Sequence, residues 1–577
     1  MPDSAVEVKH NQKSKRIIVT AKDEHGKSVP IRYKRIDENT IRINGLQDTT
    51  KLRVNVVAKP KLEDEKWYQW TQAGARFLMM LRNVSVSYRN TYAMGLPSFM
   101  PYVGNMLGQK KNNGLMAPGL DFAFGFVGDG YIDRAQERGW LLNSDSVASP
   151  ATTNNTEDIQ IKATLEPLPD LKIDLSASRT MNRTKSVQFM YAGSPTTQSG
   201  SFNMTTISIA TAFKSAGNAD NGYDSEPFRR FIDYLDVIQR RVENRYQGTR
   251  YPEGVGYTGT FNPENGTVNK YGADVMVPAF LAAYTGGRAS TTPLDIFPAI
   301  TRILPNWNLS YKGLSNLPWV RDHLKSVTLT HGYKSVYAIG SFNSYSSWIE
   351  YMSGSDMGYV ENTTTGTYVP SSAYDISTVS INEAFSPLIG LNVTMQNNMT
   401  LKLEYRKTRV LTLSMTAAQI NEATSADIVF GWGYKINDLN LGSLFKSKST
   451  SQKASARNRK GSKSTKATDD DKASTSKNSK SSKSGSKSNF AHSLNLRFDF
   501  SYRDQNALTR NIQTGLSEAT SGNRAIKASF AADYVISRYV TFSLYYDRQR
   551  NQPLLSSNAY PTITQDFGFN LKLTLTR

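Results

Sequence analysis

Side chains that commonly carry chemistry are few and widely spaced in this sequence. No two of the five histidines have the spacing of metal ligands; they are His10, His25, His323, His331 and His492. The chain contains no cysteine, which excludes disulfides, thiolate chemistry and cysteine metal sites. No Ser/His/Asp set and no pair of carboxylates stands out. The sequence therefore predicts no enzyme activity, no metal site and no cofactor.

One glycine-rich segment and one histidine invite a closer reading. Gly125-Phe-Val-Gly128-Asp-Gly130 loosely resembles a phosphate-binding loop, but it lacks the following Lys-Ser/Thr and the βαβ context. A tight loop between two elements is the expected structure. His331 is expected to form a hydrogen bond within a strand or a lumen.

The positive charge is concentrated in one segment. The 577 residues include 69 Lys and Arg against 49 Asp and Glu, a net charge of +20, which suits nucleic acid, an anionic surface or a basic loop. Residues 446–488 hold 13 Lys and Arg and 3 Asp, or +10, so half of the excess lies there. This Lys/Ser-rich run also has 14 serines and almost no apolar residue, which predicts a disordered loop. Contact with anionic lipid or nucleic acid is the functional alternative, although no nucleic-acid partner is expected.

Most of the remaining chain alternates apolar and polar residues with a period of two. The clearest hairpin joins Ile159–Leu165 to Leu171–Ala177 across the turn at 166–170. The same pattern recurs at 84–88, 201–213, 307–311, 327–339, 388–395, 401–415, 428–434, 526–534, 540–546 and 567–575. Several of these strands reach ten residues or more, against a usual five or six.

The pattern divides the chain into five parts. Residues 1–60 form a small β unit, 61–77 a linker, 78–445 long strands with long loops, 446–488 the Lys/Ser-rich run, and 489–577 the C-terminal strands. One segment, 227–246, has apolar residues at helical spacing and predicts an amphipathic helix with Pro227 in its first turn.

Alternation alone fits either a soluble sandwich or an outer-membrane barrel. Strand length favours the barrel, because about 9 to 11 residues cross a bilayer at a tilt. Short connections that alternate with long ones near the C-terminus, and tyrosines at strand ends, favour it too. The longest apolar run, Val275–Tyr284, contains Pro278 and is too short for a spanning helix. The N-terminus shows no apolar signal core, so we expect either a cytosolic chain or part of a longer protein.

The stretch LNLRFDFSYRD, residues 494–504, shows how the two faces are assigned. The predicted lipid-facing residues are Leu494, Leu496, Phe498, Phe500 and Tyr502, together with Phe567, Phe569 and Leu571 near the C-terminus. The predicted lumen-facing residues are Asn495, Arg497, Asp499, Ser501 and Arg503, together with Lys572. In this assignment one face meets lipid and the other a wet channel.

Several phrases resemble the C-terminal part of the SprA/Sov family. They include LMMLRNVSVSY (78–88), GLPSFMP (95–101), APGLDFAFG (117–125), RGWL (138–141), SVTLTHGYKSVYAIGSF (326–342), INEAFSPLIGLNVTMQNNMTLKLEY (381–405), FGWGYKI (430–436), SLNLRFDFSYRDQ and FGFNLKLTL. They occur in order from about residue 70 to the end, and residues 15–58 resemble the small β insertion that precedes this part.

The resemblance implies a role beyond what pattern alone can give. Members of the family form the bacterial outer-membrane translocon of the type IX secretion system and are linked to gliding motility. It implies a very large β-barrel at the cell surface, with a PorV-type partner barrel, a plug protein and secreted cargo proteins as partners, in a lipid bilayer. This sequence is shorter than a full member and lacks a signal peptide, so we expect the C-terminal portion of a longer or interrupted gene. It also ends in Arg577, whereas many outer-membrane proteins end in an aromatic residue that they present to their assembly machinery. Phe567 and Phe569 would then take that role.

The expected fold is therefore all-β: the C-terminal part of a large antiparallel outer-membrane β-barrel, with one amphipathic helix and a small N-terminal β unit. The expected function is a non-enzymatic, protein-conducting channel segment. The alternatives are another outer-membrane transporter or porin, or a soluble basic β protein that binds nucleic acid.

Overall fold

The structure is a computed structural model that describes most of the chain. It describes residues 5–13, 16–44, 51–58, 71, 79–102, 104–112, 115–128, 130–142, 149–188, 196–253, 257–264, 268–351, 357–362, 364–437, 439, 492–537, 539–555 and 560–574. The chain forms two compact units, Met1–Arg82 and Asn83–Arg577. The predicted run at 446–488 lies outside the described residues, as does the predicted linker 61–77 apart from Thr71.

The first unit is a small β structure, in the part of the chain where the sequence predicts one. Its two antiparallel sheets have three strands each. One contains β1 (Val6–Lys9), β5 (Thr40–Asn44) and β4 (Arg32–Arg35), and the other β3 (Ser28–Val29), β2 (Ile17–Lys22) and β6 (Arg53–Ala58). Ile41, Ile43 and Ala21 are its buried apolar side chains.

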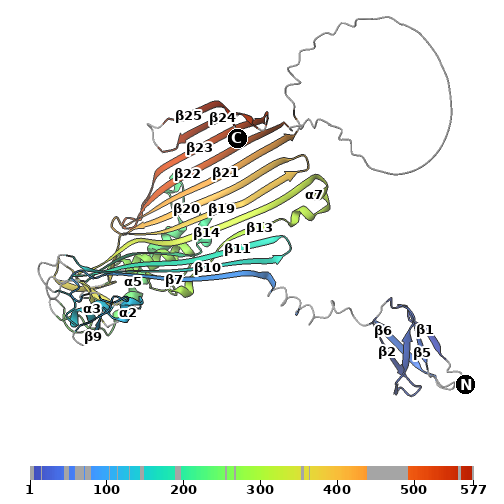
Figure 1. Cartoon of the computed structure of the whole chain (residues 1–577), viewed down its shortest axis with the longest axis horizontal. Coiled ribbons are helices and arrows are strands. Elements are labelled where there is room, and N and C mark those ends of the chain that lie inside the picture. The colour runs from blue at the N-terminus through green and yellow to red at the C-terminus, as the bar shows by residue number, and fades with distance from the viewer. Residues whose placement is uncertain are drawn as a thin grey trace, which may run out of the picture. The chain divides into compact units, whose positions relative to one another are not determined.

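A large antiparallel sheet dominates the second unit (Figure 1). From one edge to the other its strands are β25 (Thr562–Leu573), β24 (Val540–Pro553), β23 (Ser517–Val535), β22 (Ser493–Asn511), β21 (Gln419–Asn437), β20 (Met399–Ser414), β19 (Thr378–Met395), β14 (Leu324–Ser344), β12 (Thr196–Thr205), β11 (Leu171–Val187), β10 (Ala151–Leu168) and β7 (Leu81–Gly95). Two short strands join off this path: β13 (Asn306–Tyr311) pairs with β11 and β14, and β18 (Tyr374–Ile376) pairs with β14. The expected all-β class and large antiparallel sheet are confirmed.

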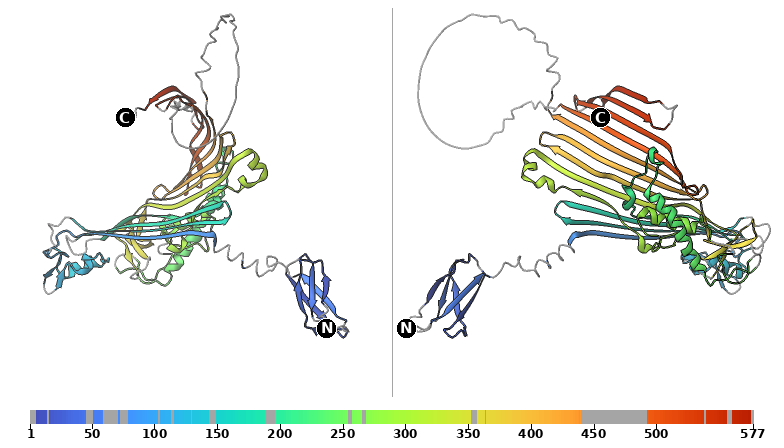
Figure 2. Two further views of the ribbon diagram at one scale, coloured as in Figure 1. Left: turned by 45° about the vertical axis from the view of Figure 1, so that its right-hand side comes forward. Right: turned by 180° about the vertical axis from the view of Figure 1, so that it is seen from behind.

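The sheet is curved but not closed in the part that the structure describes. Figure 2 shows it bending like an open trough, with one concave and one convex side. Among the described strands, β7 and β25 are the two edges and do not pair with each other. Register between neighbouring long strands is mostly continuous: β20, β21 and β22 pair along their whole lengths without a shift. Such continuous pairing keeps alternate side chains on the same side of the sheet throughout.

The structure contains the predicted amphipathic helix and, in the part of the chain that it describes, a second long helix that the sequence did not predict. Helix α5 (Glu226–Tyr246) lies where the sequence predicts it, but a second long helix, α6 (Ala273–Thr285), contains the apolar run with Pro278 inside it. Because α6 is buried on nearly every side, its sequence lacks the helical spacing that reveals an amphipathic helix. The predicted strand at 201–213 is also shorter than expected, because β12 ends at Thr205 and a short helix, α4 (Ile209–Ala212), follows.

The remaining elements are short. They are α2 (Leu120–Ala123), α3 (Tyr131–Glu137), α7 (Pro318–His323), the 3-10 helices η2 (Ala219–Asn221), η3 (Ile300–Arg302) and η4 (Gly313–Asn316), the hairpin β8 (Lys110–Asn112) and β9 (Leu115–Ala117), and the sheet of β15 (Ile349–Glu350), β16 (Gly358–Asn362) and β17 (Thr367–Ser371). None of the described helices is both long and apolar enough to cross a membrane.

The main core lies where α5 and α6 pack against the convex side of the sheet (Figure 2). Phe231 of α5 meets Phe280 of α6 edge to face, with ring centroids 6.5 Å apart. The sheet contributes Tyr337, Ile381, Leu411 and other buried side chains to the same cluster. The helices thus cover the convex side near the strand ends where β20 and β21 turn at 415–418.

Candidate functional site: the two faces of the large sheet

Aromatic side chains lie opposite one another across the C-terminal strands. Phe498 on β22 pairs with Trp432 on β21 and with Phe530 on β23. Phe430, two residues before Trp432 on β21, packs edge to face against Phe498, with the ring centroids 6.4 Å apart. Directly paired residues in an antiparallel sheet project from the same face, so these aromatic residues form one continuous surface.

This surface continues over six strands, and we call it the convex band. Its members share the face on which Leu411 and Ile420 meet the helices, but they lie further along the strands, beyond the helical cover. They are Leu401, Leu403, Tyr405, Ile428, Phe430, Trp432, Tyr434, Leu494, Leu496, Phe498, Phe500, Tyr502, Ile526, Phe530, Tyr534, Phe542, Leu544, Tyr546, Phe567, Phe569 and Leu571. On β22 the band covers Leu494 to Tyr502, close to the 9 to 11 residues that cross a bilayer at a tilt. All predicted lipid-facing residues belong to it.

No member of the band is buried in the part of the chain that the structure describes, and exposure is greatest at the β25 edge. At the β25 edge Phe567 exposes 69% of its surface, Phe569 71% and Leu571 59%. Side chains of this size bury 150 Å² or more when covered, so a row of them in contact with water is unfavourable. An exposed apolar surface spread over several strands indicates a membrane or a partner surface.

The concave side of the same strands is polar and charged. Asn495, Arg497, Asp499 and Arg503 alternate with the band residues along β22, and Lys572 on β25 pairs with Thr541 on the same side. The structure thus brings the predicted lumen-facing residues to one face. Each face of these strands therefore carries residues of one kind.

Ion pairs cross the concave face between strands. Arg503 binds Asp427 of β21 with two hydrogen bonds, Nε to Oδ1 at 2.8 Å and Nη2 to Oδ2 at 3.0 Å. Arg497 approaches Asp533 of β23 at 3.8 Å. Arg503 is half exposed, so its pair contributes little stability but fits a water-facing wall.

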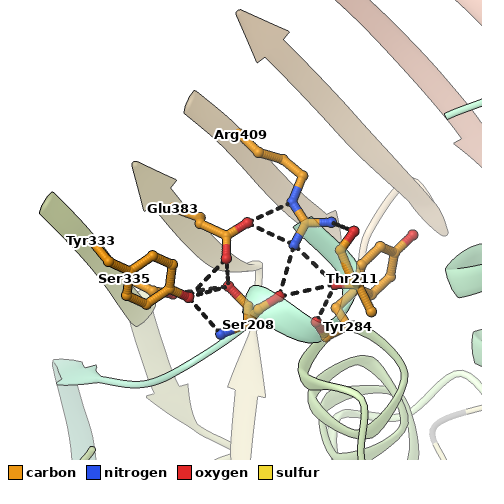
Figure 3. A network of polar contacts seen from close by, with 7 residues as sticks. All are labelled: Ser208, Thr211, Tyr284, Tyr333, Ser335, Glu383 and Arg409. Atoms are coloured by element: carbon orange, nitrogen blue, oxygen red, sulfur yellow. Dashed lines mark hydrogen bonds and ion pairs between the residues drawn. The ribbon is translucent and has the colours of Figure 1, made fainter. Parts of the chain in front are cut away.

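A buried polar network fastens the helical cover to the convex face (Figure 3). Glu383 of β19 accepts hydrogen bonds from Ser208 Oγ at 2.7 Å and from Tyr333 Oη at 2.8 Å. Arg409 of β20 pairs with the same carboxylate at 2.9 Å and donates from Nη1 to the Thr211 carbonyl oxygen, also at 2.9 Å. Both charged side chains are almost fully buried. Burying a charge is costly unless it is paired and hydrogen-bonded, as both are here.

A second buried ion pair also binds the segment that leads from β12 into the helices. Arg510 of β22 binds Glu422 of β21 at 2.8 Å and is completely buried. Its Nη1 donates to the Tyr223 carbonyl oxygen at 2.6 Å and its Nη2 to that of Ala216 at 2.9 Å. Residues 206–225 connect β12 to α5, so both arginines bind the backbone of the segment that leads into the helices.

Sequence reasoning did not identify these two pairs, although a signal was present. Glu383 stands between Ile381 and Phe385, and Arg409 precedes Leu411 and Leu413, at positions that period-two alternation assigns to the apolar face. A charge on the apolar face of a strand indicates a buried partner. The partner segment, which includes Ser208 and Thr211, is far away in sequence and could not be named from the pattern.

A cavity of about 980 Å³ opens beside the helices. Its lining includes Arg183, Arg245, Tyr246, Asp274 and Trp348. Burial raises the pKa of Asp274 to about 7, with backbone hydrogen bonds and Arg245 acting in the opposite direction. This carboxyl therefore exchanges its proton close to neutral pH.

The other sequence candidates have structural roles. Gly125 has a positive φ of 76° directly after α2, as a tight loop requires, and Gly130 precedes α3. His331 Nδ1 lies 2.6 Å from the Leu388 carbonyl oxygen, the strand hydrogen bond that the sequence predicts. Within the described ranges, no group of three His, Asp or Glu residues is placed to hold a metal ion.

Comparison with known proteins gives little further guidance. No protein-family model matches the chain. No curated protein matches it either. Among solved structures, the β domain of the Bordetella autotransporter BrkA is similar with a TM-score of 0.19 and 7% sequence identity, over 74% of this chain and 92% of that one.

Proposed function

We propose that this chain forms part of an outer-membrane β-barrel through which folded proteins are secreted. The observation that carries the proposal is the convex band. An aromatic and aliphatic surface of bilayer-crossing height lies on one side of long antiparallel strands, and a charged surface lies on the other. In an outer-membrane barrel the apolar face meets lipid and the polar face lines a wet lumen.

The soluble alternative explains the band poorly. A soluble β sandwich covers its apolar face with a second sheet. Here the helices cover only one end of the convex face, and Phe567, Phe569 and Leu571 remain more than half exposed. Lipid would cover these side chains without any further protein layer.

The sheet edges constrain the proposed barrel. Unpaired strand edges are not tolerated in hydrocarbon, because their N–H and C=O groups have no water to bind. In the membrane β7 and β25 would therefore pair with each other or with further strands.

The finer role rests on the resemblance to the SprA/Sov family. The motifs that carry it include Phe430–Ile436 and Ser493–Gln505, which lie on β21 and β22 with side chains on both faces of the sheet. In this role the chain acts without catalysis: cargo crosses a water-filled lumen, and energy comes from elsewhere. A PorV-type barrel, a plug protein and secreted cargo are the proposed partners, and the outer membrane at the cell surface is the proposed location.

A deletion experiment tests both levels of the proposal. The chain should sediment with outer membranes and leave them only in detergent, and deleting its gene should abolish export of folded cargo to the medium. If export continues and only the uptake of small solutes falls, the chain is a porin. If the chain stays soluble without detergent, the barrel itself is excluded.

A further inference from the structure

We infer that three arginines on the convex face, Arg524, Arg548 and Arg550, form a binding site for the phosphate groups of anionic lipids. This site, which we call the convex arginines, rests on the proposed membrane function, since it needs the convex band to lie in a bilayer. It goes beyond that function because it predicts which class of lipid headgroup contacts the chain in one of the two leaflets.

The register places the three side chains together. Arg548 and Arg550 of β24 pair with Ala528 and Ile526 of β23. Ala528 and Ile526 lie on the convex face, so the two arginines that pair with them lie on that face too. Arg524 belongs to the same row of β23 and lies diagonally from Arg550. Residues two apart on one strand, and diagonal neighbours on adjacent strands, are about 7 Å apart, so long arginine side chains can reach one common group.

The cluster lies directly at one end of the convex band. Arg548 follows Tyr546 of the band on β24, and Arg524 precedes Ile526 of the band on β23. The Arg524 guanidinium also lies 5.8 Å from the ring centre of Tyr502, the last band residue on β22. An aromatic residue followed by an arginine is the arrangement expected where hydrocarbon meets lipid headgroups.

The charge of the cluster is only partly balanced. Asp504 lies 3.6 Å from Arg524 and is the one carboxylate that pairs with the cluster within the described residues. Arg548 and Arg550 are exposed, and among the residues that the structure describes neither has an ion-pair partner. Three guanidinium groups against one carboxylate leave a net charge of +2 beside an apolar surface.

The opposite end of the band differs. There the convex side of β22 to β25 carries Leu494, Tyr534, Phe542 and Leu571, while Lys572 points to the concave side. These four strands therefore present convex arginines at one boundary only, the one nearer the α5 and α6 end. In a bilayer, this asymmetry would direct the phosphate contacts of the convex arginines to one leaflet only.

Phosphate is the ligand that suits this cluster best. A guanidinium matches two phosphate oxygens at once and stays charged at every physiological pH. A lipid supplies both the phosphate for the arginines and the acyl chains for the band, whereas a free anion supplies only the first. The occupant that fits both surfaces is therefore a lipid with a phosphate headgroup.

The test uses the full chain in detergent micelles and follows lipid binding by native mass spectrometry. The probe is phosphatidic acid, with phosphatidylcholine as the neutral comparison. The test variant is R548Q/R550Q, and the control is R497Q/K527Q, which removes the same charge from the concave face. Since each near-surface arginine strengthens the attraction about fivefold, the test variant should bind phosphatidic acid about 25-fold more weakly and the control variant should bind it normally.

Two results would overturn the inference. One is an equal loss of phosphatidic acid binding in the test and control variants, which would mean that net charge rather than this cluster attracts the lipid. The other is displacement of phosphatidic acid by inorganic phosphate at the same concentration, which would indicate a simple anion site. Flotation with phosphatidylcholine vesicles separates failure of the arginine site from failure of the proposed membrane function. If the unmodified chain does not insert into the vesicles, the membrane function is excluded. If it inserts but shows no preference for phosphatidic acid, only the arginine site is excluded.

Discussion

Arg409 on β20 and Glu383 on β19 form a buried ion pair 2.9 Å long, at the level where the sheet passes beneath α4. The carboxylate also binds Ser208, and the guanidinium binds the backbone of Thr211, so one pair joins two strands to the segment that leads into the helices. With Arg510 and Glu422 it fixes the position of α5 and α6 on the convex face.

Removing one partner of this pair should loosen the helical cover. Glu383→Gln leaves the Arg409 charge buried and unpaired, which typically costs about 3 to 5 kcal/mol. Hydrogen exchange of α5 amides should accelerate accordingly. Asp427→Asn is a matched control, because it breaks the half-exposed pair with Arg503 and should cost about 1 kcal/mol or less. Equal, small effects in both variants would mean that the buried network does not hold the helices.

An arginine in the middle of the convex band should destabilise insertion. Phe498→Arg places a charge close to the expected bilayer midplane, at a cost of about 2 to 4 kcal/mol. Ser529→Arg lies one residue from Phe530 on the concave side and between Asp499 and Asp547, so it should be nearly neutral. Reversible urea unfolding in lipid vesicles measures both. A neutral Phe498→Arg with a costly Ser529→Arg would mean that the faces are assigned the wrong way round.

Much of the sheet could be predicted because its information is local. Alternation in 494–503 depends only on neighbouring residues, and it assigned each predicted lipid-facing and lumen-facing residue to a consistent face. The strands themselves were underestimated: β19 begins at Thr378, ten residues before the predicted start at Leu388, because Glu383 and Pro387 interrupt the apolar pattern.

The helical cover could not be predicted in the same way. Helix α6 has no polar face, so its sequence lacks the period of an amphipathic helix, and its packing against α5 is a contact between residues far apart in sequence. The convex arginines also escaped notice, because Arg548 and Arg550 become neighbours of Arg524 only through the register of β23 and β24.

The stability of the α5 and α6 region should depend on pH through Asp274. Its pKa is about 7 in the folded protein, above the ordinary value of 3.8, so the folded state holds a proton that the unfolded state has lost in this window. Stability should therefore fall as pH rises from about 4 to about 7 and then level off. Hydrogen exchange of α6 at several pH values should show this slope, and Asp274→Asn should remove it. A slope unchanged in the variant would assign the effect to another group.

The two ends of the strands should lie on opposite sides of the membrane. Thr514 lies in the turn between β22 and β23 near the helices, whereas Asn397 lies in the turn between β19 and β20 at the other end. Strand β21, which precedes the Lys/Ser-rich run in the sequence, ends on the same side of the sheet as Asn397. In intact cells an impermeant maleimide should label Thr514→Cys but not Asn397→Cys, and protease should spare the run. The reverse labelling would invert the proposed orientation.

An accessibility scan of β22 should show whether the convex face meets lipid and the concave face meets water. Because the chain has no native cysteine, single cysteines from Leu494 to Arg503 can each carry a spin label in membranes. Collision with oxygen, which concentrates in lipid, should peak at Leu494, Leu496, Phe498, Phe500 and Tyr502, while collision with a water-soluble nickel complex should peak at the residues between them. A scan without this period-two alternation, or with the nickel complex reaching Phe498, would contradict this assignment of the two faces.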